Sequence, residues 1–220
     1  MYLREFIEIA ILHFLAVASP GPDFAVTARY SLAYGRRIGR YVALGIGTGI
    51  LIHVAYSLLG VTLIIHRYQW VYAALLLLGA LYLGWIGWQA IQAKPAQQAP
   101  AAAAAAAAAG QLSRGKAFRV GFITNGLNVK ATLFFMALFT AVIDPSTPTW
   151  IKSSYGLYMA IATAAWFMLL ATALTVGPIY ERIWRFGHWL DRLMGAILLL
   201  LCGKLVIDWW QVIQVLVSGE

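Results

Sequence analysis

Six apolar segments divide the chain, and each reaches the length of about 20 residues that a helix needs to cross a bilayer. They cover residues 6–28, 41–65, 70–91, 118–143, 155–176 and 190–215. A soluble domain of 220 residues needs many charged residues on its surface, but only 11% of these residues are charged. The sequence therefore predicts an all-α membrane protein with six transmembrane helices.

The basic residues follow the loops between these segments in an alternating pattern. Successive loops carry 4, 1, 4, 1 and 3 Lys or Arg residues. Because cytoplasmic loops are enriched in positive charge, the first, third and fifth loops should face the cytoplasm. Both termini are then expected outside, in the periplasm of a cell with an inner (plasma) membrane. Topology also explains the net charge of +8, so we expect membrane lipid and no nucleic acid as a partner.

The chain also divides into two halves of three spans each. A linker rich in alanine and proline, residues 94–116, separates a first half, residues 1–93, from a second half, residues 117–220. Three is an odd number, so the second half enters the membrane from the opposite side. This arithmetic predicts a 3+3 inverted repeat, with interrupted first and fourth helices, as in many secondary transporters.

The first interruption is a run of helix-breaking residues in the first span. Pro20 and Pro22 lack backbone donors, and Gly21 between them loosens the chain. Broken backbone at membrane depth is tolerated only against protein or a water-filled cavity, so this run predicts a substrate-binding or coupling site that includes Asp23. The alternative is that Asp23 only caps the next helix.

The second interruption lies at the start of the fourth span, where Asn125, Asn128 and Lys130 follow one another closely. A lysine near the middle of a span costs on the order of 3 kcal/mol if it faces lipid. We therefore expect these three side chains to face a binding cavity. The alternative is that Lys130 reaches back to the cytoplasmic boundary with its flexible side chain.

Other polar and small residues have structural interpretations. Lys204 and Asp208 are four residues apart and should pair on one helix face. His13 and His53 are candidates for a proton relay, although a lone helical histidine is more often a packed, hydrogen-bonded residue. Close helix packing is expected at three small-residue spacings, which are Gly45/Gly49, Ala80/Gly84 and Ala160/Ala164.

The sequence resembles the lysine exporter (LysE) superfamily, and within it the threonine/homoserine efflux (RhtB-like) family. In the first half the resemblance rests on Ser19-Pro20-Gly21-Pro22-Asp23-Phe24, Tyr34-Gly35-Arg36-Arg37, Ala43-Leu44-Gly45-Ile46 and Tyr82-Leu83-Gly84-Trp85-Ile86-Gly87. In the second half it rests on 118–125, Asn128-Val129-Lys130-Ala131 and 189–196. The resemblance implies a transporter that exports a small neutral amino acid such as threonine or homoserine, coupled to proton entry by antiport. It implies no enzymatic activity and no cofactor, and it leaves a homo-oligomer open.

The resemblance also frames a hypothesis for binding. A zwitterionic amino acid needs one anionic and one cationic partner in a poorly hydrated cavity. Asp23 could meet the ammonium group or a proton, and Lys130 could meet the carboxylate together with Asn125, Asn128 and a helix N-terminus. Without substrate, Asp23 and Lys130 could pair with each other. The family usually has proline where this chain has Val129, which predicts a less sharply broken fourth helix.

Three other functions compete with amino-acid export. Export of another small solute or a metal cation is the first, but His13, Asp23 and His53 are too scattered to predict a metal site. A membrane enzyme is the second, and the sequence contains no H-E-x-x-H or G-x-S-x-G motif that would indicate catalytic residues. The single cysteine, Cys202, excludes a CxxC redox pair. A structural membrane subunit is the third, but it has no need of a broken polar helix in each half.

Overall fold

A computed structural model describes residues 2–67, 69–93 and 112–218. Within these ranges the chain is helical, with short loops and no strand. The helices are α1 (Tyr2–Ala18), α2 (Pro22–Arg67), α3 (Gln69–Ile91), α5 (Arg114–Gly126), α6 (Val129–Ala141), α7 (Thr149–Ala173) and α8 (Gly177–Ser218). The alanine run of the predicted linker lies outside the described residues.

The helices make this a multi-pass membrane protein. Four of them, α2, α3, α7 and α8, contain segments long and apolar enough to cross a membrane. The consecutive helices α5 and α6 bend by 56° at their junction and form a fifth crossing if they are taken as one broken span. The remaining helix, α1, has 17 residues, slightly fewer than the roughly 20 that a perpendicular span needs. The predicted sixth span thus depends on α1.

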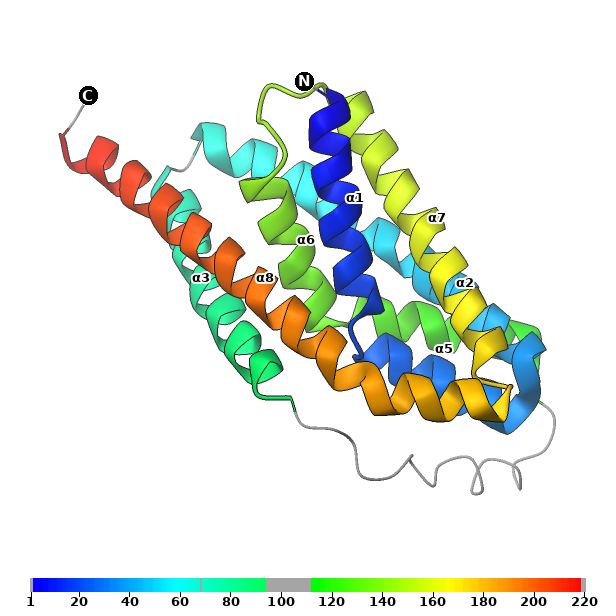
Figure 1. Cartoon of the computed structure of the whole chain (residues 1–220). Helices are drawn as coiled ribbons and strands as arrows, with labels where there is room; N and C mark the ends of the chain where they lie inside the picture. Colours follow the sequence, from blue (N-terminus) through cyan, green and yellow to red (C-terminus); the bar gives the residue numbers. More distant parts are fainter. Residues whose placement is uncertain (1, 68, 94–111, 219–220) are drawn as a thin grey trace.

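One glycine turns α2 through a sharp corner. Gly35 has φ 82° and ψ 164°, a conformation that side chains with a Cβ rarely adopt. The segment before it, together with α5 and the start of α8, lies at the lower end of Figure 1, whereas both termini lie at the upper end. The two ends of the chain are therefore on the same side of the bundle.

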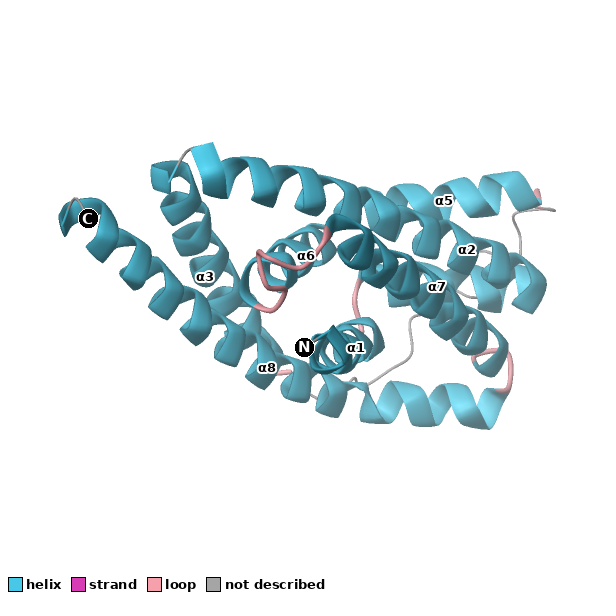
Figure 2. Cartoon of the chain, turned by 90° about the horizontal axis from the view of Figure 1, so that it is seen from above, coloured by secondary structure: helices cyan, strands magenta, loops and turns pink. Residues whose placement is uncertain are grey.

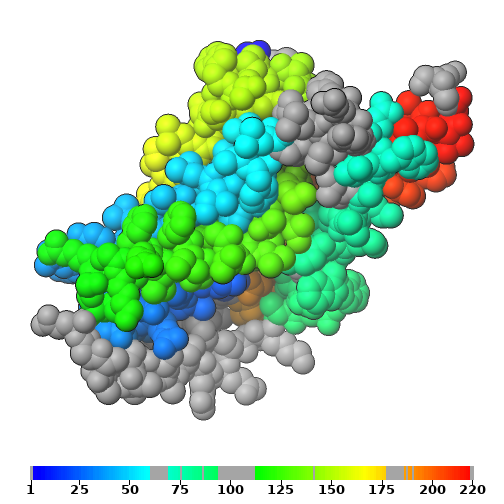
Figure 3. Space-filling view, turned by 180° about the vertical axis from the view of Figure 1, so that it is seen from behind, coloured from blue at the N-terminus to red at the C-terminus, as the bar shows by residue number. Residues whose placement is uncertain are grey.

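Helices of the two predicted halves pack against each other. The most extensive contacts of α2 are with α5 and α7, and those of α3 are with α8. Figure 3 shows the back face, where α2 and α5 run side by side and α3 lies beside α8. A Cβ on Gly87 would lie 3.0 Å from the Gly195 carbonyl oxygen, and one on Gly195 would lie 2.7 Å from the Gly87 oxygen. Such close approach gives membrane helices their packing energy.

The first helix packs against the bundle along one face, whereas large apolar side chains on its other side, such as Ile7 and Ile11, are exposed. Figure 2 shows α1 nearly end-on, with α6, α7 and α8 around it. Its Glu5, Ile9 and His13 are spaced four residues apart, so they share one face, and all three are buried. The two polar members of this face must therefore find hydrogen-bond partners inside the protein.

Glu5 ties α1 to the loop between α6 and α7. Its carboxylate accepts hydrogen bonds from the backbone N–H of Asp144 (2.7 Å), the hydroxyl of Thr147 (3.1 Å) and the hydroxyl of Tyr155 (3.0 Å). None of these donors carries a positive charge, so the carboxylate is held by neutral hydrogen bonds alone. These bonds fix the N-terminal end of α1 in the bundle.

Replacing Glu5 with alanine is expected to destabilise the protein by about 2–4 kcal/mol, because several buried donors lose their acceptor together. Thermal unfolding of the detergent-purified protein measures the effect as a lower midpoint. The matched control is Glu8→Ala, since Glu8 is half-exposed and pairs with Arg4 within one helix. Equal midpoints for the two variants would contradict a structural role for the Glu5 cluster.

Candidate functional site

The two helix breaks lie across a small buried cavity of about 50 Å³. One water molecule needs roughly 10–15 Å³, so the cavity has room for a few waters in this conformation. Its polar lining residues are His13, Ser19, Asp23, Asn125, Asn128, Lys130 and Thr163, and Phe134, Phe135 and Phe167 contribute to its apolar wall. The structure therefore brings together side chains that are more than 100 positions apart in the sequence.

The first break separates α1 from α2. α1 ends at Ala18, and Pro22 is the first residue of α2, where a missing N–H does no harm. Pro20 and Pro22 shape this break but do not line the cavity, whereas Gly21 does. A Cβ on Gly21 would lie 3.7 Å from Nζ of Lys130, so the backbone here passes close to the amine. At the first break the backbone of Gly21 is thus a direct neighbour of the Lys130 side chain.

The second break separates α5 from α6 at Leu127 and Asn128. The Asn128 side chain caps α6, since its Oδ1 accepts from the backbone N–H groups of Lys130 (3.1 Å) and Ala131 (3.4 Å). The two helices meet at 56° although Val129 stands in place of proline. The span is therefore broken at Asn128 without a proline at position 129.

Asp23 binds the two asparagines of the second break. Its Oδ2 accepts from the side-chain amides of Asn125 (2.9 Å) and Asn128 (3.0 Å). Its Oδ1 is buried and has no partner among the described residues. The interpretation of Asp23 as a cap of α2 is wrong, because its carboxylate is directed across the cavity to the other half. One carboxylate oxygen is thus left with unused hydrogen-bonding capacity.

Lys130 points inward and belongs to a different polar chain. Its Nζ donates to the hydroxyl of Ser19 (2.9 Å), so the idea that it reaches back to the boundary is wrong. Ser19 in turn donates to Oδ1 of Asp191 (2.9 Å). Within the described ranges the ion pairs are Arg4–Glu8 and Lys204–Asp208. The hypothesis of a direct Asp23–Lys130 pair is therefore wrong, although both residues line the same cavity.

The two histidines both lie near the ring of Phe135. The Nε2 atom of His13 lies 3.0 Å from the Thr163 hydroxyl, and His13 lines the cavity. The Nε2 atom of His53 lies 2.8 Å from the carbonyl oxygen of Asn125, and His53 is not among the residues that line the cavity. The Phe135 ring centroid lies 6.4 Å from that of His13 and 5.7 Å from that of His53. Both histidines thus contact the same aromatic ring, and a role for either in proton relay stays a prediction.

Sequence reasoning assigned no role to Ser19, Thr163 or Asp191. Asp191 is a carboxylate at the start of the sixth apolar segment, and a charged residue at this position could have indicated a functional role. Ser19 adjoins the Pro-Gly-Pro run, but a serine in a turn has many local uses. Thr163 lies in an apolar helix and carries no signal of its own.

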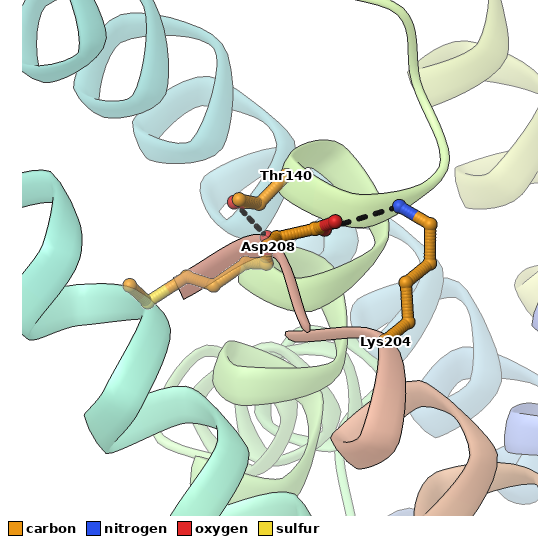
Figure 4. A network of polar contacts seen from close by, with 4 residues as sticks. Thr140, Lys204 and Asp208 are labelled. Carbon is orange, nitrogen blue, oxygen red and sulfur yellow. Dashed lines mark hydrogen bonds and ion pairs between the residues drawn. The ribbon is translucent and has the colours of Figure 1, made fainter. Parts of the chain in front are cut away.

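Lys204 and Asp208 form the predicted pair on α8, at 3.2 Å. Figure 4 shows this pair near Thr140, which donates to the Met136 carbonyl within its own helix. Thr140 and Met136 line a larger cavity of about 800 Å³ between α2, α3, α6 and α8, and none of the described side chains that line it is charged. The described residues contain no group of three or more His, Cys, Asp or Glu that could hold a metal ion.

The chain is similar to known transport proteins along most of its length. It is 28% identical over 195 residues to the threonine efflux proteins of Escherichia coli K12 and of Salmonella typhi, which covers 89% of this chain and 94% of each relative. It is 24% identical to the uncharacterized membrane protein YahN of Escherichia coli K12, over 82% of this chain and 79% of YahN. No solved structure shows significant similarity. The family model of the LysE type translocators matches residues 14–209, so the chain belongs to this translocator family.

Proposed function

We propose that this protein exports a small neutral amino acid, such as threonine or homoserine, across the inner membrane by proton antiport. The observation that carries the proposal is the convergence of Asp23 and Lys130 on one buried cavity between two helix breaks. Family membership and the threonine efflux relatives support the same class of substrate.

The polar groups of the cavity match the two ends of a zwitterion. The unpartnered Oδ1 of Asp23 offers an acceptor to an ammonium group or to a proton. Lys130 offers a cation to a carboxylate, and the asparagine amides hold Asp23 in place from the other side. Charge-assisted hydrogen bonds of this kind are about twice as strong as those between uncharged groups. They therefore favour a zwitterion, which has two charged ends, over a molecule without charged groups. The α6 N-terminus adds little, because Asn128 already caps it.

The size and walls of the cavity favour a small side chain. Phe134, Phe135 and Phe167 contribute to an apolar wall around the charged groups. The present volume holds only a few waters, so an amino acid enters after the cavity widens. The two helix breaks are natural hinges for such a change, since their backbone is not fixed by a continuous helical ladder. Alternate opening to the two membrane faces would then complete transport.

The membrane arrangement proposed here has six crossings. α1 would form the first and the broken α5–α6 pair the fourth, so that residues 1–93 and 117–220 are inverted halves. The residues of the basic loops would face the cytoplasm, and both termini would face the periplasm. Asp23 of the first half and Lys130 of the second then occupy corresponding breaks.

Inverted membrane vesicles test the proposal directly, because export appears in them as uptake. Vesicles with an imposed pH gradient, acidic inside, are given a panel of radiolabelled amino acids that includes threonine and homoserine. The expected result is concentrative uptake of small neutral amino acids that collapses when a protonophore removes the gradient. Uptake equal to that of vesicles lacking the protein, for every amino acid tested, would contradict the proposal.

A further inference from the structure

A hydrogen-bonded chain runs from Lys130 through Ser19 to Asp191. The amine donates to the serine hydroxyl at 2.9 Å, and the hydroxyl donates to the carboxylate at 2.9 Å. The three residues come from α6, the first helix break and α8, so the chain joins three separate parts of the fold. Because Ser19 gives its only hydrogen to Asp191, its lone pairs are turned toward the lysine.

The two charged residues that line the cavity, Asp23 and Lys130, have different kinds of partner. Asp23 is satisfied on one oxygen by two neutral amides and has no ion pair, whereas Lys130 is linked to Asp191. Arg192, next to Asp191, is turned away and donates to the Ala93 carbonyl at 3.0 Å. Asp191 is therefore linked through Ser19 to Lys130, while the neighbouring Arg192 binds elsewhere.

We propose that Asp191, acting through Ser19, is the resting counterion of Lys130, and that the substrate carboxylate displaces it. This inference rests on the proposed function for its second part only. In the empty site Asp191 compensates the buried amine, which leaves Asp23 for the ammonium group or a proton. When substrate leaves, Lys130 again binds Ser19, which binds Asp191. Ser19 and Asp191 thus compete with the substrate carboxylate for Lys130, and this competition speeds release of the substrate.

If Asp191 competes with the substrate carboxylate for Lys130, the Asp191→Asn variant should bind substrate more tightly. The asparagine retains an acceptor for Ser19 but removes the competing charge, so L-threonine should bind about tenfold more tightly. Turnover in vesicles should fall, because release slows. L-Threonine amide, which lacks the carboxylate, should bind the variant and the original protein equally. Calorimetry on the detergent-purified proteins measures both dissociation constants.

A matched control exists on the same helix. Asp208→Asn makes the same chemical change in the Lys204–Asp208 pair, outside the cavity, and should leave both dissociation constants unchanged. A merely structural defect in Asp191→Asn would weaken binding of both ligands. Weaker or unchanged binding of L-threonine by Asp191→Asn would overturn the displacement.

A second measurement needs no substrate and separates this inference from the proposed function. Thermal unfolding is compared for Asp191→Asn, Lys130→Met and the double variant. If the two charges are coupled, the double variant loses less stability than the sum of the single variants. Additive losses would overturn the counterion assignment whatever the ligand results. If the original protein binds no L-threonine but coupling is found, the proposed substrate is wrong and the counterion assignment stands.

Discussion

Export by an Asp23→Asn variant is expected to fall on the order of 100-fold. The change keeps the shape of the side chain but removes the charge that would meet an ammonium group or a proton. The single oxygen of the asparagine can still accept from the amides of Asn125 and Asn128, which both bind the same oxygen of Asp23, so the loss comes from the missing charge and the missing second oxygen. Loss of one partner of a buried, hydrogen-bonded charge costs about 2–5 kcal/mol, and each 1.4 kcal/mol is tenfold. Initial rates of threonine uptake into inverted vesicles measure the loss.

A control variant and an exchange assay identify the cause of the lower export by Asp23→Asn. Asp208→Asn, on a helix face outside the cavity, should transport at the original rate. Exchange of labelled for unlabelled threonine without a pH gradient separates binding from coupling. If Asp23→Asn exchanges normally but cannot concentrate threonine, Asp23 carries the proton and another group holds the ammonium. Full gradient-driven uptake by the variant would exclude both roles for Asp23.

The sequence was sufficient to locate the two breaks that form the cavity. Pro20, Pro22 and the Asn128 region interrupt otherwise apolar segments, and physical chemistry predicts that such breaks face protein or water. The pairing of the breaks across one cavity followed from the expectation of two inverted halves. The structure brings Asp23, Asn125, Asn128 and Lys130 together at this place.

Individual hydrogen bonds could not be predicted in the same way. The sequence places charges in the membrane but does not show which side chains meet, since that depends on helix rotation. A direct pair of Asp23 and Lys130 was one hypothesis from the sequence, yet each is held by residues of another element. Neutral amides and a serine hydroxyl solvate the two charges, and such residues are too common to stand out in a sequence.

The helix boundaries show a related limit. Residues 29–40 were expected to form a loop between the first two spans, but they belong to α2. Hydropathy reports how apolar a segment is and does not report its direction. The corner at Gly35 is likewise invisible to hydropathy, although it decides where the short first part of α2 lies. Backbone conformation at a few glycines and prolines therefore determines more of this fold than segment length.

The contact between α2 and α5 depends on two glycines that face each other. A Cβ on Gly121 would overlap the carbonyl oxygen of Val42, and a Cβ on Gly45 would overlap that of Phe118. One turn further along, a Cβ on Gly49 would come within 2.7 Å of Oδ1 of Asn125. The same contact thus packs the two helices and positions an asparagine that binds Asp23.

Gly121→Ala is therefore expected to destabilise the protein by about 3 kcal/mol or more, because the overlapping atom belongs to the backbone and has no rotamer to change. The measurement is the unfolding midpoint and the fraction of monodisperse protein in size-exclusion chromatography. Gly203→Ala on α8 is the control, since nothing lies within 4 Å of a Cβ there. That variant should be neutral or slightly more stable, because alanine favours helix over glycine by up to about 1 kcal/mol. If both alanine variants unfold at the same temperature, the close approach of α2 and α5 at Gly121 does not contribute to the stability of the fold.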